Sequence, residues 1–192
     1  DGDRLVDMQG NEPATPLLAG AIKRPITPTV RGRRVLIAGY EPGRPATGIH
    51  DELWVRALAL QLGNNQVVLI TLDLFGLFRE DVELIKQQAV AEGLPGENVV
   101  VLCTRNHAGP DTLGKWNRGL FGKGTNERYK RFLHQEVIRV IKLAVEALQP
   151  AQAYVTRSQV FGLTADGENT ELAVLELRTL LGRKIATLVN FS

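Results

Sequence analysis

The sequence is poor in the residues that cross-link a chain or bind metals. It has one cysteine and three histidines in 192 residues. The single Cys103 excludes an internal disulfide, and the cysteine and histidines do not have the spacing of a zinc-binding motif. Because Cys103 lies in an apolar stretch, we expect a buried, unreactive thiol rather than a nucleophile.

Long hydrophobic runs and an excess of one charge are also missing. The longest apolar run, Val67 to Phe78, is interrupted by Asp73 and is too short to cross a bilayer, so no transmembrane segment is expected. The 23 Lys and Arg residues against 21 Asp and Glu residues give a net charge of +2, and the basic residues are scattered. This balance predicts no nucleic-acid partner.

What is present is the composition of a folded domain. Hydrophobic residues make up 44% of the chain and charged residues 23%, which are ordinary globular values. Residues 1–16 are polar and contain proline, which predicts a flexible lead-in before one domain over 17–192. The chain stops inside the apolar run 184–192, so we expect an incomplete domain and a C-terminal remainder of the same protein.

Hydrophobic periodicity predicts a mixed order of strands and helices. A turn at Gly63–Asn65 joins two apolar stretches into a hairpin. Helical spacing predicts helices over 79–92 and 126–148, the second with His134 at its surface. The fold class is therefore α/β, a mixed β-sheet flanked by helices. The predicted strands cover residues 17–26, 34–39, 52–62, 66–72, 98–104, 151–160, 172–178 and 184–191.

The most informative segment is Val99–Asp111, where a predicted buried strand runs into a polar turn. Arg105, Asn106 and His107 precede an Ala-Gly-Pro corner that includes Gly109. Ligands of open α/β sheets gather where strands end at their carboxyl edge, because the loops there leave a crevice. A guanidinium, an imidazole and a carboxylate at such a place predict a binding or catalytic site.

This segment resembles a loop of the neutral (non-lysosomal) ceramidase family. Arg105-Asn-His-Ala-Gly-Pro-Asp111 is similar to the His-x-His-Ser-Gly-Pro loop of that family. Other segments resemble the family in the same order, and their spacing fits from residue 18 onward. They are the opening strand at 19–28, the turn Thr47-Gly-Ile-His-Asp51, the strand 69–74 with Asp73 near its end, and the strand 188–191.

The resemblance implies a hydrolase that cleaves the amide of N-acyl sphingosine, hence a lipid or other small-molecule substrate and an exported (secreted or periplasmic) protein. Family members hold zinc with two histidines and with a Glu and a Tyr from later sequence, and a later serine takes part in catalysis. The first zinc-ligand histidine falls on Arg105, whose guanidinium has no lone pair to donate. We therefore assign no metal ligand and leave the cofactor open.

Arg105, His107 and Asp73 are the candidate catalytic residues. Arg105 either binds an anionic group through its bidentate fork or forms a structural salt bridge with Asp73 or Asp111. His107 matches the second histidine of the family loop and would line the site, or it is a loop histidine bonded to nearby backbone. Asp73 either orients His107 or caps a loop.

The candidate substrate-binding residues surround these three. His50 and Asp51 either line the same crevice or form a turn. Trp116 either anchors its glycine-rich loop or offers a stacking surface. The other candidates are Asn106, Gly109 and Asp111.

The sequence thus predicts the N-terminal part of the catalytic region of a ceramidase-like amide hydrolase. In this hypothesis, Arg105 replaces the positive charge of the metal and stabilises an oxyanion. The alternative is a non-catalytic domain that binds a glycan, a lipid headgroup or a protein in the same crevice.

Overall fold

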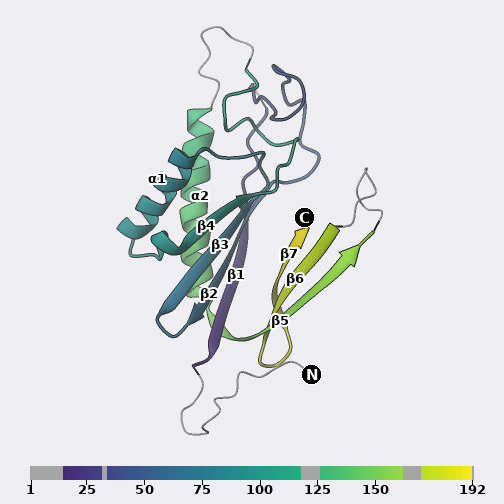
Figure 1. Ribbon diagram of the computed structural model, residues 1–192. Helices are drawn as coiled ribbons and strands as arrows, with labels where there is room; N and C mark the ends of the chain where they lie inside the picture. Colours follow the sequence, from purple (N-terminus) through teal and green to yellow (C-terminus); the bar gives the residue numbers. More distant parts are fainter. Residues whose placement is uncertain (1–14, 32–33, 118–125, 162–169, 192) are drawn as a thin grey trace.

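A computed structural model describes residues 15–31, 34–117, 126–161 and 170–191 (Figure 1). Over these ranges the chain forms one mixed sheet with the strand order β4-β3-β2-β1-β5-β6-β7, together with two α-helices. The predicted α/β class is confirmed. No helix in these ranges is long and apolar enough to span a membrane. Residues 1–14 of the predicted lead-in lie outside the described residues.

The elements follow the predicted order. The strands are β1 (Leu17–Pro25), β2 (Trp54–Leu62), β3 (Asn65–Leu72), β4 (Val99–Cys103), β5 (Gln149–Val160), β6 (Thr170–Thr179) and β7 (Lys184–Phe191). The helices are α1 (Arg79–Ala91) and α2 (Glu127–Glu146), with a short 3₁₀ turn η1 (Gly96–Asn98) before β4.

The first half of the sheet combines a hairpin with a parallel unit. β2 and β3 pair antiparallel around Gly63, which has a φ of +58°. α1 then carries the chain back along the sheet, so that β4 pairs parallel with β3, up to the pair Leu72↔Cys103. As a result, β3 and β4 end side by side at the same edge of the sheet (Figure 1).

The two helices cover one face of β1–β4 (Figure 1). Asn126 begins α2 by accepting a hydrogen bond from the Tyr129 backbone N–H at 3.1 Å. Burial against this layer raises the pKa of the Cys103 thiol to about 11, so the thiol stays protonated at neutral pH. The largest fully buried side chains of this core include Ile70, Leu72, Ile85, Leu133 and Ile141.

The second half of the sheet, β5–β7, curves away from β1 on the side opposite the helices (Figure 1). β5 is in register with β1 through only two residue pairs, Leu18↔Pro150 and Ala19↔Gln149. A second, smaller apolar core holds the two halves together. Its buried members are Ala19, Leu58, Ala151 and Leu177.

The predicted strand over residues 34–39 is wrong. This segment makes only two isolated bridges, to Pro45 and Pro110. The backbone turns sharply after them, with a φ of +92° at Gly39 and +26° at Tyr40. Two successive residues with positive φ cannot continue an extended strand, so the apolar residues of this segment belong to a loop.

The predicted surface position of His134 is also wrong. Its side chain is buried between α1 and α2, with Nε2 3.4 Å from the Asp81 Oδ1 atom. Lys130 donates to the same carboxylate oxygen at 2.7 Å. The periodicity of α2 indicated the stripe that faces the sheet, but α1 packs on a second side of α2 and buries His134 there.

Candidate functional site

The predicted site lies where β3 and β4 end. Since Leu72 and Cys103 are register partners, Asp73 and the segment 104–107 leave the sheet at the same edge (Figure 1). The loop 34–46 lies against them, because the Ala38 N–H donates to the Gly109 carbonyl at 2.9 Å. Loops from three parts of the sequence therefore meet at this edge.

Asp111 organises these loops from within. Only 5% of the residue is exposed, and its carboxylate accepts three backbone hydrogen bonds of 2.8–3.0 Å. The donors are the N–H groups of Leu113, Gly114 and Trp116. With its oxygens engaged in this way, Asp111 fixes the shape of the loop.

An aromatic cluster formed by Tyr40, Phe75, His107 and Trp116 stands beside Asp111. The His107 ring lies 5.1 Å from the Tyr40 ring and 5.0 Å from the Phe75 ring, and Phe75 lies 4.7 Å from Trp116. Trp116 also donates from Nε1 to the Tyr40 carbonyl at 3.2 Å. Trp116 thus anchors the loop, and its ring is part of the cluster.

Close packing positions the ring of His107. A Cβ placed on Gly39 would lie 2.6 Å from the His107 Cγ atom, so only glycine leaves room for this imidazole. Arg44 donates to the His107 carbonyl at 3.1 Å and stacks over Tyr40. The side chain remains exposed to solvent at the outer surface of the cluster.

Arg105 has an unusual backbone and a charge that no described carboxylate pairs with. Its φ is +57°, in the left-handed region that non-glycine residues rarely adopt. Its guanidinium lies 5.5 Å from the centre of the Phe75 ring, and no carboxylate of the described residues lies within ion-pair distance of it. The predicted salt bridges to Asp73 and Asp111 are therefore absent.

Asp73 is bound to neither His107 nor Arg105. Its carboxylate accepts from Arg56 Nη1 at 2.9 Å and 3.0 Å and from the Trp54 backbone N–H at 3.0 Å. Of the predicted roles, this arrangement corresponds to capping, because it closes the beginning of β2. The expected bond from Asp73 to His107 does not form.

His50 and Asp51 form an ion pair in an exposed loop. The distance from His50 Nδ1 to Asp51 Oδ2 is 2.6 Å, and their side chains are 97% and 85% exposed. The hydrogen bond from Asp51 raises the pKa of the His50 imidazole. Both residues border a pocket of about 460 Å³ that also includes Asp73 and Asn106.

The structure thus divides the predicted residues between two adjoining groups. His50, Asp51, Asp73 and Asn106 line the 460 Å³ pocket. The aromatic side includes Arg105, His107, Asp111 and Trp116. Gly109 packs between the two groups, and a Cβ placed on it would lie 3.2 Å from the Asp73 carbonyl oxygen.

The described residues do not fit a zinc site. No three His, Cys, Asp or Glu side chains in the described ranges lie close enough together to hold a metal ion. Arg105 occupies the position that resembles the first ligand, and a guanidinium cannot coordinate a cation. We therefore derive no chemistry of this site through zinc.

Sequence reasoning missed Tyr40, Arg44 and Phe75. The first two follow the predicted strand 34–39, and the glycine and proline residues around them are the signal in the sequence that marks a loop. Phe75 follows Asp73 by two residues just after β3 ends, so its position at the same edge of the sheet could have been predicted from the sequence.

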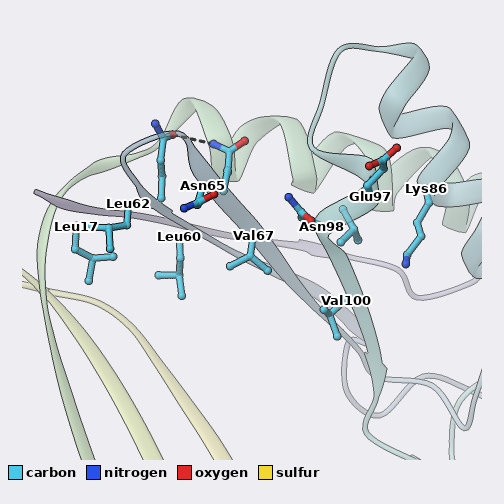
Figure 2. Close-up of a pocket in the computed structure, with 12 residues that line it drawn as sticks. Leu17, Leu60, Leu62, Asn65, Val67, Lys86, Glu97, Asn98 and Val100 are labelled. Atoms are coloured by element: carbon cyan, nitrogen blue, oxygen red, sulfur yellow. Dashed lines mark hydrogen bonds between the residues drawn. The ribbon is translucent and has the colours of Figure 1, made fainter. Parts of the chain in front are cut away.

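A different hollow lies at the opposite edge of the sheet (Figure 2). It has a volume of about 570 Å³ and lies between the β2–β3 hairpin and η1. Its polar side chains include Lys86, Glu97 and Asn98. None of the predicted site residues borders this hollow, so it is separate from the candidate site at the carboxyl edge.

Comparisons with known proteins address the fold. No protein-family model and no curated protein matches the sequence. Among solved structures, the chain is similar to neutral ceramidase from Pseudomonas aeruginosa and to a ceramidase complexed with C2, each at a TM-score of 0.77 and 20% identity. The match covers 91% of this chain and 31% of each ceramidase chain, so the chain spans less than a third of these structures. The resemblance found in the sequence is confirmed in the structure: this chain has the fold of the corresponding part of neutral ceramidase.

Proposed function

We propose that the carboxyl-edge loops of this ceramidase-related domain bind an N-acyl amide substrate and contribute Arg105 to its hydrolysis. The observation that supports this proposal is the state of Arg105: a strained backbone holds an exposed guanidinium that no described carboxylate neutralises. Strained residues of this kind persist where the surrounding structure fixes them, and they concentrate at functional sites.

In this proposal the guanidinium acts on the acyl carbonyl. Its N–H groups donate to the carbonyl oxygen and stabilise the negative charge that develops there when water attacks. His107, held between Tyr40 and Phe75, contacts the substrate beside that carbonyl. Asp73 and Asp111 are engaged in structural bonds, so this proposal assigns the activation of water to neither of them.

A second candidate is a binding domain without hydrolysis, which would use the same crevice for a glycan, a lipid headgroup or a protein. The observation that favours it is Arg105, because a guanidinium, which cannot coordinate a metal, stands where the similar family loop has its first zinc-ligand histidine. The two candidates differ in whether the amide bond of a bound substrate is broken.

The deciding experiment is an assay of N-acyl sphingosine hydrolysis by the full-length protein and by Arg105→Ala. We expect the variant to lower kcat by about 100-fold or more, the usual effect of losing one oxyanion donor. Arg79→Ala, which removes an exposed arginine of α1, is the matched control and should leave kcat unchanged. Substrate binding without turnover by the wild-type protein would reject hydrolysis in favour of the second candidate.

The role of Arg105 as a replaced metal ligand has its own test. We expect that full-length Arg105→His gains zinc, measured as metal per chain by elemental mass spectrometry. No gain would contradict the replacement. The exported location implied by the ceramidase resemblance is part of the same proposal, and it is tested by fractionation of cells that express the natural protein.

A further inference from the structure

The face of the sheet opposite the helices changes from polar to apolar along the strands. Register partners on β1, β2 and β3 form a row across the sheet. Because alternate residues of a strand share a face, the next row on the same face lies two residues further along each strand. The row nearest the carboxyl edge is charged and polar, and the two rows behind it are wholly apolar. From that edge inward, the rows are Lys23–Arg56–Thr71, Ala21–Leu58–Leu69 and Ala19–Leu60–Val67.

β7 turns these rows into a groove. The segment 185–188 of β7 faces the first two rows across a hollow of about 440 Å³. This volume and the mostly apolar lining are those of a small-molecule site. Figure 2 shows Leu60 and Val67, from the third row, pointing to the same side of the sheet as Leu17 and Val100, so the apolar surface continues beyond the groove.

The charge available at the polar end of the groove is positive. The Lys23 ammonium lies 4.4 Å from the centre of the Trp54 ring and is exposed. No carboxylate of the described residues pairs with it, whereas Arg56 in the same row is already held by Asp73 at 2.9 Å. An anion that reaches this end would therefore meet the exposed ammonium of Lys23, which no described carboxylate neutralises.

We propose that this groove binds a single aliphatic chain with an anionic head, such as a long-chain carboxylate. The head lies at Lys23, and the chain runs along Leu58 and Leu69 toward Leu60, because this direction matches the polar-to-apolar order of the rows. Each methylene that enters the groove strengthens binding about fourfold. The proposal rests on the groove alone and does not require the proposed amide hydrolysis.

The test is a calorimetric titration of the full-length protein with dodecanoate below its micelle concentration. We expect saturable binding of dodecanoate and binding about 250-fold weaker for octanoate, because four fewer methylenes are buried. Dodecyltrimethylammonium, whose head is repelled by Lys23, should bind more than tenfold more weakly than dodecanoate. Equal affinity for the cationic and anionic amphiphiles would overturn the proposal. So would the absence of dodecanoate binding, which is the result expected if another part of the protein covers the groove.

Variants place the ligand within the groove. Lys23→Gln should weaken dodecanoate binding about tenfold, the effect of losing one charge-assisted bond, while Lys142→Gln on the exposed side of α2 should leave it unchanged. Ala21→Phe fills the second row and should abolish binding; if it does not fold, the exposed Lys23→Gln variant decides. Unchanged affinity in Lys23→Gln would reject the assigned site. The binding test measures no hydrolysis. A protein that binds dodecanoate but cleaves no amide would therefore contradict the proposed hydrolysis and leave the groove proposal intact.

Discussion

Two groups of charged residues lie on the helix side and at the carboxyl edge of the same sheet, and they use charge in opposite ways. Between α1 and α2, Asp81 is 6% exposed and pairs with Lys130, with His134 beside it. At the carboxyl edge, Arg105 is exposed and has no described carboxylate partner. The first group connects two helices. The second leaves a guanidinium exposed to solvent, and its residues are held by backbone bonds and ring packing instead.

The largest expected effect separates the two groups by stability. Asp81→Ala leaves Lys130 unpaired at a position that is only 17% exposed, so it should destabilise the fold by about 3–5 kcal/mol. Arg105→Ala, which removes no charge pair, should change the free energy of unfolding by about 0.5 kcal/mol or less. Urea unfolding of both variants measures the difference. Similar losses in the two would mean that the edge charge also serves stability.

A smaller effect tests how the edge holds His107. Gly39→Ala introduces a Cβ 2.6 Å from the His107 ring at a φ of +92°, and should cost about 1–3 kcal/mol while displacing the imidazole. Gly48→Ala is the matched control, since its Cβ would meet no atom within 4 Å. The displacement is read from the imidazole proton shifts in NMR spectra. A His107 environment that survives Gly39→Ala would show that the ring is not fixed by this contact.

The third prediction concerns the pH dependence of the helix group. Burial is the main cause that lowers the pKa of His134 from its ordinary 6.5, with Lys130 acting in the same direction and Asp81 and Glu127 acting against it. The unfolded state therefore binds the proton more readily, and stability should fall as pH drops below 6.5 toward the folded-state pKa. Thermal unfolding across this range, compared with His134→Gln, isolates the effect. The same slope in the variant would assign it to other groups.

The smallest expected effect lies at the exposed His50–Asp51 pair. Asp51→Asn removes the carboxylate that raises the pKa of His50, so this pKa should fall toward its ordinary value. The unfolding temperature should stay the same, because an ion pair this exposed contributes little to stability. An NMR titration of His50 checks the pKa. A measurable loss of stability in Asp51→Asn would place this pair with the helix group instead.

Local patterns predicted most of the elements, and long-range contacts explain the exceptions. The bounds of β2, β3 and α1 lie within two residues of the predicted ones. Their hydrophobic periodicity and the glycine turns that end them depend only on residues close together in the sequence. The pairing of Asp73 with Arg56 depended on strand register, and the burial of His134 depended on where α1 docks.

The sequence predicts where the candidate site lies in the fold, but not which of its side chains touch one another. The edge at which β3 and β4 end follows from the parallel unit, so the meeting of Asp73 with the segment 104–107 was predictable. The rings around His107 were not, because Tyr40 reaches them through a loop whose positive φ values cannot be read from an apolar run.

The short β1–β5 junction has a consequence for how the protein unfolds. Its two register pairs include Pro150, which has no N–H to donate, so few backbone hydrogen bonds connect the halves of the sheet. Cooperative units of native proteins separate where such bonds are few. The amides of β5–β7 should therefore exchange with deuterium as one unit and those of β1–β4 as another, and opening of the first unit would widen the groove beside β7 while the helix-covered core stays closed.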